Sequence, residues 1–291
     1  MAGGPTTAFG VAVDGLADRY ERERVLRNAV TATELGLSPT VLLATVEQAA
    51  RDGVDLATVE PAEGDVTGTG TTPLGSRLPG LELAELAELC LRHGMNHQAG
   101  ALLERALDQP EDQPQTPAGA APPPGGFDPR DLRPRWAWLA VAALDASAGE
   151  PADVEAAVLR ATALCTDLEA RADARRADQQ LAGAAQGYYE LAAAWDVAAH
   201  WEAGADAEGT VDPTLDGVDP ERVEAAARDL ERSATALEAA GECSWLRLEP
   251  TEGLVAAGAA LDRRTSAEYL RSLCLRSPGP AVAAEGEPKT A

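Results

Sequence analysis

Apolar residues recur at helical spacing along most of the chain, and residues 81–110 show the pattern most clearly. The apolar positions of two successive helices there are Leu83, Leu86 and Cys90, then Ala99, Leu102, Leu103 and Ala106. The second set follows the i, i+3, i+4, i+7 spacing of a helix with one apolar face. Gly94 lies between them, where a residue free to take positive φ ends a helix. This segment therefore predicts a helical hairpin.

The same periodicity continues on both sides of this hairpin. Further helical patterns cover residues 14–35, 38–53, 136–143, 154–168, 179–207, 219–241, 251–262 and 265–275. The breaks coincide with turn residues, as at Gly149-Glu150-Pro151, Asp219-Pro220 and Gly241. No segment alternates convincingly between apolar and polar residues, so we predict an all-α fold of stacked antiparallel helical hairpins.

Three segments lack helical periodicity and predict the domain boundaries. Residues 60–80 mix Gly, Thr and Pro and are expected to be a linker, and residues 109–134 contain the run Ala-Pro-Pro-Pro-Gly-Gly. The tail, 277–291, has no apolar pattern. We therefore expect an N-terminal helical segment at 14–59, a helical-repeat domain at 81–276 with a disordered insertion at 109–134, and a disordered tail.

The hairpin at 81–110 resembles a tetratricopeptide repeat. The matching residues are Leu86, Ala87, Gly94, Ala99, Leu103 and Ala106, followed by Pro110. Cys90 stands where the family usually has an aromatic residue, and Pro110 falls one residue early. Residues 179–207 show the second-best match, with a turn expected near Trp195. The resemblance implies a stack of helix pairs, whereas a plain helical bundle would give similar hairpins.

The tetratricopeptide resemblance also implies a function. Proteins of that family bind other proteins in a concave groove, here expected between successive first helices. The candidate partner-binding residues are the aromatic residues Trp136, Trp138, Tyr188, Tyr189, Trp195 and Trp201. At least half of these should prove to be core residues, because aromatic residues at helical spacing usually are. We expect a non-catalytic scaffold or adaptor, without a cofactor, that binds another protein or a peptide.

Composition changes this picture in two ways. The 291 residues are 45 % hydrophobic but only 4 % aromatic, and Ala dominates the apolar residues, which favours helices. The net charge is −24, with Lys289 as the one lysine. Such acidity is typical of a halophile, with a high-GC bacterium as the alternative. It opposes binding to nucleic acid and anionic lipid, and it favours a partner with Arg or Lys.

The expected location is the cytoplasm. The chain has no apolar run of about 18 residues, and its N-terminus lacks a basic region followed by an apolar block. Cys90, Cys165, Cys243 and Cys274 are widely spaced within helical patterns. They are therefore expected to be buried thiols in a reducing compartment.

A transcriptional regulator is the first alternative. Residues 32–41 resemble the core of a helix-turn-helix motif, with Leu35-Gly36 in the turn and Ser38-Pro39 opening a second helix within residues 16–53. The candidate DNA-contact residues are Arg19, Arg22, Arg27, Thr40, Gln48 and Arg51. The candidate recognition helix offers Arg51 as its only basic residue.

An enzyme is the second alternative, and it would require a pocket gathering Glu, Arg and one histidine from distant helices. No phosphate-binding loop, GxSxG, HExxH or CxxC motif is present. Cys90, His93 and His97 have spacings of three and four and are the weak candidates for a metal site. Gly94 interrupts their helix, so we predict core and turn roles for them.

Overall fold

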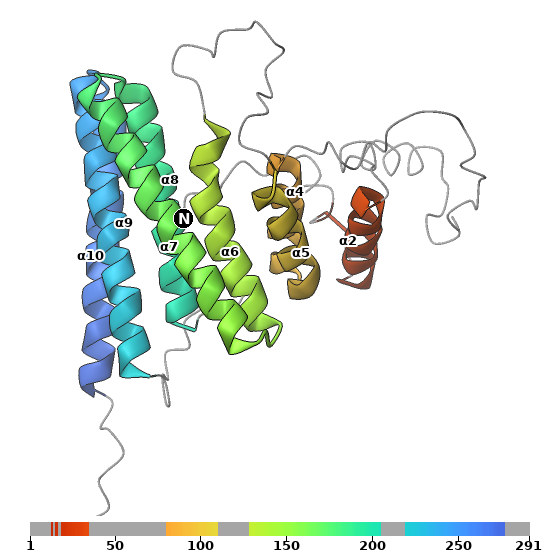
Figure 1. Ribbon diagram of the computed structural model, residues 1–291. Helices are drawn as coiled ribbons and strands as arrows, with labels where there is room; N and C mark the ends of the chain where they lie inside the picture. The colour runs from red at the N-terminus through yellow and green to blue at the C-terminus, as the bar shows by residue number, and fades with distance from the viewer. Residues whose placement is uncertain are drawn as a thin grey trace, which may run out of the picture. The chain divides into compact units, whose positions relative to one another are not determined.

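The computed structural model (Figure 1) describes residue 13 and residues 15–16, 19–34, 80–109, 128–204 and 219–276. Every regular element in these residues is helical, so the predicted all-α fold is confirmed for them. The elements are α2 (Arg19–Glu34), α4 (Gly80–Arg92), α5 (Asn96–Leu107), the 3₁₀ helix η3 (Pro129–Leu132), α6 (Arg133–Ala146), α7 (Pro151–Ala177), α8 (Leu181–Glu202), α9 (Pro220–Leu246) and α10 (Pro250–Arg276). None of these helices is long and apolar enough to cross a bilayer.

The chain divides into two compact units, residues 1–171 and 172–291. We call them unit 1 and unit 2. The boundary falls inside α7, and both units lie partly within the range 81–276 that the sequence groups as one repeat domain. The tail at 277–291 lies outside the described residues, as do most of the linker at 60–80 and most of the insertion at 109–134.

The predicted hairpin of unit 1 is present as α4 and α5. All seven apolar residues expected on its inner faces are buried: Leu83, Leu86, Cys90, Ala99, Leu102, Leu103 and Ala106. Gly94 lies between the helices with φ of 73°, as its position predicts. α4 also contacts α2, and α5 packs against α6. Arg133 joins α6 to the end of α5, because its guanidinium donates to the Leu107 carbonyl at 2.6 Å.

Four hairpin turns in the described residues end a helix with the same hydrogen bond. The backbone N–H groups of Met95, Gly149, Gln180 and Glu249 each donate to the carbonyl five residues earlier, at 2.8–3.0 Å. The residue before each donor has positive φ: Gly94 at 73°, Ala148 at 57°, Gln179 at 61° and Leu248 at 62°. This is the Schellman arrangement, in which a non-glycine residue at positive φ costs roughly 1 kcal/mol. The recurrence gives the array a common way of reversing direction.

Unit 2 consists of the end of α7 together with α8, α9 and α10, and its helices are longer than the sequence predicts. The turn expected near Trp195 is wrong, because residues 181–202 form one continuous helix. The segment contains no proline, and alanine, its commonest residue, has the highest helix propensity.

The predicted helix end at Gly241 is also wrong, because α9 continues to Leu246. A Cβ at Gly241 would lie 3.3 Å from the Cβ of Ala256, so this glycine allows α9 and α10 to approach closely. The two short helices expected after Pro250 are one helix, α10. Thr265 does not interrupt it, because its hydroxyl donates to the Leu261 carbonyl within the helix.

A polar contact in unit 2 connects α8, α9 and α10. Arg263 of α10 donates to both carboxylate oxygens of Asp196 on α8, at 2.7–3.1 Å. Ser233 of α9 donates to the same carboxylate at 2.7 Å. One carboxylate therefore fixes the register of three helices.

Candidate functional site

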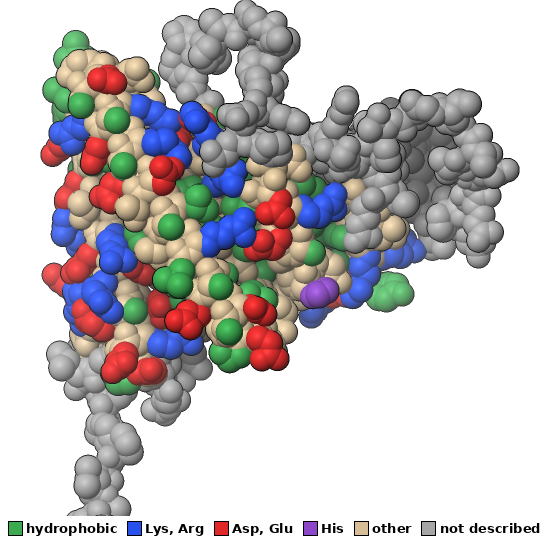
Figure 2. Space-filling model, in the orientation of Figure 1, with side chains coloured by type: hydrophobic (Ala, Val, Ile, Leu, Met, Phe, Trp, Pro, Cys, Tyr) green, Lys and Arg blue, Asp and Glu red, His purple; other side chains and the backbone are tan. Residues whose placement is uncertain are grey.

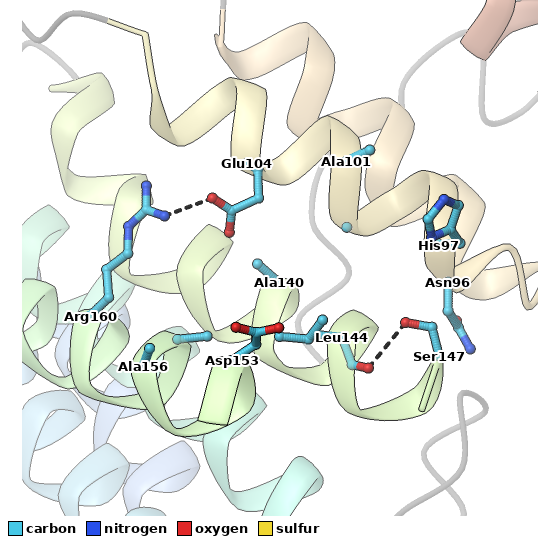
Figure 3. A pocket seen from close by; sticks show the side chains of 12 residues that line it. Asn96, His97, Ala101, Glu104, Ala140, Leu144, Ser147, Asp153, Ala156 and Arg160 are labelled. Carbon is cyan, nitrogen blue, oxygen red and sulfur yellow. Dashed lines mark hydrogen bonds and ion pairs between the residues drawn. The ribbon is translucent and has the colours of Figure 1, made fainter. Parts of the chain in front are cut away.

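The candidate site is a groove in unit 1 between α5 and α7, with α6 at its floor (Figure 3). Its volume is about 490 Å³. The apolar residues that line it are Gly100, Ala101, Ala140, Leu144, Ala156 and Ala157. The polar residues are Asn96, His97, Glu104, Ser147, Asp153 and Arg160.

The hollow exists because small residues meet where the three helices converge. Gly100 and Ala101 follow Asn96 and His97 by one turn of α5, and Ala156 and Ala157 occupy the second turn of α7. Side chains of this size leave space that Leu or Phe would fill. Ala101 and Ala156 are exposed, so a ligand in the groove would contact them directly.

An ion pair joins the two sides of the groove. Arg160 of α7 donates to the Glu104 carboxylate of α5 at 2.8 Å, as Figure 3 shows, and approaches Asp108 at 3.7 Å. Both partners of the shorter pair are more than a third exposed, so the pair contributes little stability. The pair bridges α5 and α7 at this end of the groove.

Asp153 supplies an exposed negative charge beside the Glu104–Arg160 pair of the groove. It is exposed in the first turn of α7, where the helix dipole favours a carboxylate, and no ion pair within the described residues includes it. The Ser147 hydroxyl nearby donates to the carbonyls of Ala143 and Leu144 at 2.8 and 3.0 Å. Asp153 can therefore accept a hydrogen bond from a ligand, whereas the Ser147 proton is already engaged.

The groove contains the residue types that the enzyme alternative requires, namely Glu104, Arg160 and His97. Their contacts are with each other and with the backbone. Glu104 and Arg160 are paired with each other, and the one hydroxyl in the groove donates to backbone carbonyls. The described residues of this groove thus lack a nucleophile hydrogen-bonded to a base, which is the arrangement that activates it.

None of the six aromatic candidates lines this groove. Trp136 and Trp138 are buried on α6, and Tyr188 and Trp195 are buried on α8. Tyr189 and Trp201 on α8 are partly buried. Four of the six are thus core residues, as expected for at least half of them.

The two tryptophans of α8 each stack against an arginine of α9. The Arg232 guanidinium lies 4.6 Å from the ring centroid of Trp195, and that of Arg222 lies 5.4 Å from Trp201. Both distances suit a cation–π contact. Trp201 and Trp195 therefore hold α8 against α9 within unit 2.

The DNA-contact candidates divide between described and undescribed residues. Arg27 is exposed on α2, Arg19 pairs with Glu23 at 3.1 Å, and Arg22 donates to the Leu16 carbonyl at 2.6 Å. Thr40, Gln48 and Arg51, with the rest of the candidate recognition helix, lie outside the described residues. DNA binding stays a prediction.

The metal candidates do not converge on one point. Cys90 is buried in the α4–α5 core, and burial raises the pKa of its thiol to about 12. That shift disfavours the thiolate that a metal requires. Within the described residues, no three His, Cys, Asp or Glu side chains are arranged to hold an ion, so Cys90, His93 and His97 do not form a site there. Cys165 and Cys243 are likewise buried thiols, as predicted.

Asp229 on α9 is the buried carboxylate with a strongly shifted pKa. Its residue is only 7 % exposed, and burial raises its pKa from 3.8 to about 6, although Arg232 at 2.9 Å opposes the shift. Between about pH 4 and 6 the folded state therefore binds more protons than the unfolded state. The free energy of unfolding should fall as the pH rises through this window, because the charged form is buried.

Asp229→Asn should consequently stabilise unit 2 above pH 7, by an amount of the order of 1–3 kcal/mol. The amide oxygen can still accept from Arg232. Urea unfolding of the variant and of the wild type between pH 4 and pH 8 measures this. A profile for Asp229→Asn that runs parallel to the wild type would contradict the assignment.

Comparison of the chain with protein-family models, with curated proteins and with solved structures found no match. The tetratricopeptide resemblance thus rests on the residues of this chain.

Proposed function

We propose that the protein is a non-catalytic interaction scaffold of helical-repeat type, acting in the cytoplasm, and that the groove between α5 and α7 binds a segment of a partner protein. The observation that carries this proposal is the open groove of about 490 Å³ with an apolar floor and an exposed carboxylate, Asp153, that is in no ion pair with the described residues. An apolar depression with a few polar groups at its edge is the usual form of a ligand site.

The hairpins support the repeat interpretation. α4–α5 and α6–α7 are consecutive hairpins with the same Schellman turn. The groove lies between their second helices, α5 and α7, rather than between the first helices as the sequence suggests. Larger side chains at Gly100, Ala101 or Ala156 would remove it.

The chemistry of the groove indicates what the partner offers. Small floor residues allow a partner backbone, or a short apolar side chain, to approach closely. Asp153 would accept from a lysine or arginine of the partner. The proposed ligand is therefore a helical or extended peptide with an apolar stripe and one basic residue.

Filling the groove should abolish partner binding without unfolding the chain. Ala156→Trp and Ala101→Trp introduce a large side chain at exposed positions that line the groove. We expect at least about tenfold weaker binding, because a hot-spot contact of this size accounts for more than 1.4 kcal/mol. Thr162→Trp is the matched control, since Thr162 is exposed on α7 but does not line the groove.

The experiment is a pull-down of the tagged chain from its host's lysate at the host's salt concentration, in nuclease-treated and untreated halves. A protein retained by the wild type and Thr162→Trp, and lost with Ala156→Trp, supports the proposal. Equal retention by all variants would exclude the groove. A protein that is recovered only without nuclease would instead support DNA binding through the candidate residues on α2.

A further inference from the structure

The groove between α5 and α7 offers a ligand few hydrogen-bonding partners along its floor. The residues there, among them Gly100, Ala140 and Leu144, are apolar, and the helices around it bond their own backbone groups. The Ser147 hydroxyl already donates to backbone carbonyls. An extended peptide would leave the N–H and C=O groups that face this floor unpaired, which is unfavourable away from water. A helix satisfies its own backbone and presents only side chains, so the occupant that fits is helical.

The groove also has a direction. α5 runs from Asn96 to Glu104 along one side, and α7 runs from Asp153 to Arg160 along the other, so the two helices are parallel (Figure 3). Both helices begin at the same end, where their free backbone N–H groups create a partial positive charge. The N-cap residue of α5 makes no side-chain hydrogen bond that would satisfy these groups. The negative C-terminal end of a ligand helix is therefore favoured here.

The opposite end of the groove carries an excess of negative charge. Two carboxylates of α5, those of Glu104 and Asp108, approach the single guanidinium of Arg160 at 2.8 and 3.7 Å. The positive N-terminal end of a ligand helix is favoured there. On the face shown in Figure 2, acidic and basic side chains are interspersed without a broad region of one sign. The charges at the two ends of the groove therefore determine the direction of the ligand.

We propose that the groove binds an amphipathic helix of a partner protein that runs antiparallel to α5 and α7 and carries a basic residue in its last turn. This inference rests on the function proposed above, the binding of a partner segment in the same groove. In this direction the basic residue meets Asp153, which lies in the first turn of α7 and is in no ion pair with the described residues. A basic residue in the last turn also suits the dipole of the ligand helix itself.

The test uses the full chain and a synthetic peptide with blocked termini. The peptide is alanine-rich and about 16 residues long, which is sufficient for a helix, with leucine on one face and an arginine in its last turn. Fluorescence anisotropy at low ionic strength measures its affinity. A proline at the centre should weaken binding at least about tenfold, because proline breaks the helix. Moving the arginine to the first turn should weaken binding about two- to fivefold, and Asp153→Asn should reduce this difference.

Photo-crosslinking shows the direction. A photoreactive group on the first residue of the peptide should label the tryptic fragment 106–130 of α5, which contains Asp108, and a group on the last residue should label 93–105, which contains His97. The reversed pattern would overturn the direction, and a proline peptide that binds as tightly as the helical one would overturn the helical occupant. In both cases, loss of binding with Ala156→Trp would leave the proposed function intact. If no peptide bound, or if Ala156→Trp left binding unchanged, the proposed function and this inference would both be refuted.

Discussion

Replacing Asp196 with alanine should destabilise unit 2 by about 3 kcal/mol, because it leaves a largely buried arginine without its counter-ion. Asp196 and Arg263 have side chains that are 22 % and 25 % exposed, and they form a two-pronged contact. The hydrogen bonds that Arg263 donates to Asp196 raise the pKa of Arg263. The arginine remains charged without them, because a guanidinium is protonated at any ordinary pH. Ser233 loses its acceptor as well.

The measurement is urea unfolding, combined with hydrogen exchange resolved by helix, because the chain has two units and one transition cannot be assumed. Exchange should quicken in α8, α9 and α10. Glu238→Ala is the matched control, since it removes an Arg264 pair that is nearly half exposed and should cost less than about 1 kcal/mol. Equal losses from both substitutions would show that Asp196 is an ordinary surface carboxylate.

A double substitution separates the charge from the packing. Asp196→Leu with Arg263→Met replaces the pair by apolar side chains, which is often close to neutral for a buried ion pair. Stability near that of the wild type would show that the cost of Asp196→Ala lies in the unpaired arginine. A loss as large as that of Asp196→Ala would show instead that the cost arises from losing the contact that aligns the three helices.

The helix starts could be predicted from the sequence because their signals are local. Pro151, Pro220 and Pro250 each open a helix, and the Asp219 side chain accepts from the Glu221 N–H as an N-cap should. The all-α class follows from the same periodicity. These features depend only on residues within one turn of each other.

The helix ends are harder to predict from the sequence, because the residue of positive φ that ends a helix is expected to be glycine. Gly94 obeys that rule, but Ala148, Gln179 and Leu248 hold the same position in the other Schellman turns. Conversely, Gly241 lies inside a helix, where α10 packs against it. Only the packing of a neighbouring helix distinguishes a glycine that ends a helix from one that makes room.

The sequence does not predict the groove, for a related reason. Its floor comes from small residues on three helices, and the Glu104–Arg160 pair that spans it joins residues 56 positions apart. The available signal was the recurrence of Gly and Ala at Gly100, Ala101, Ala156 and Ala157. That signal is weak in a chain whose apolar residues are mostly alanine. The aromatic residues were more conspicuous, and most of them are in the core.

Gly149→Ala should destabilise unit 1 by about 2 kcal/mol and also weaken binding in the groove. A Cβ at this position would lie 2.6 Å from Leu144 Cδ1 and 2.9 Å from the Leu144 carbonyl oxygen. That carbonyl accepts the Gly149 N–H at 2.9 Å, so it cannot move without breaking the turn. Overpacking of this kind typically costs 1–3 kcal/mol, and Leu144 lines the groove, so its displacement reaches the site.

Ala148→Gly is the adjacent control and should have the opposite sign. Ala148 has φ of 57°, so glycine there relieves strain and should stabilise the unit by up to about 1 kcal/mol. Urea unfolding and partner titration of both variants measure the pair. If Gly149→Ala matched the wild type in both, the close approach of Leu144 would not constrain the turn. If Ala148→Gly lowered the free energy of unfolding, Ala148 would not be the residue at positive φ in this turn. Glycine relieves strain only at such a position.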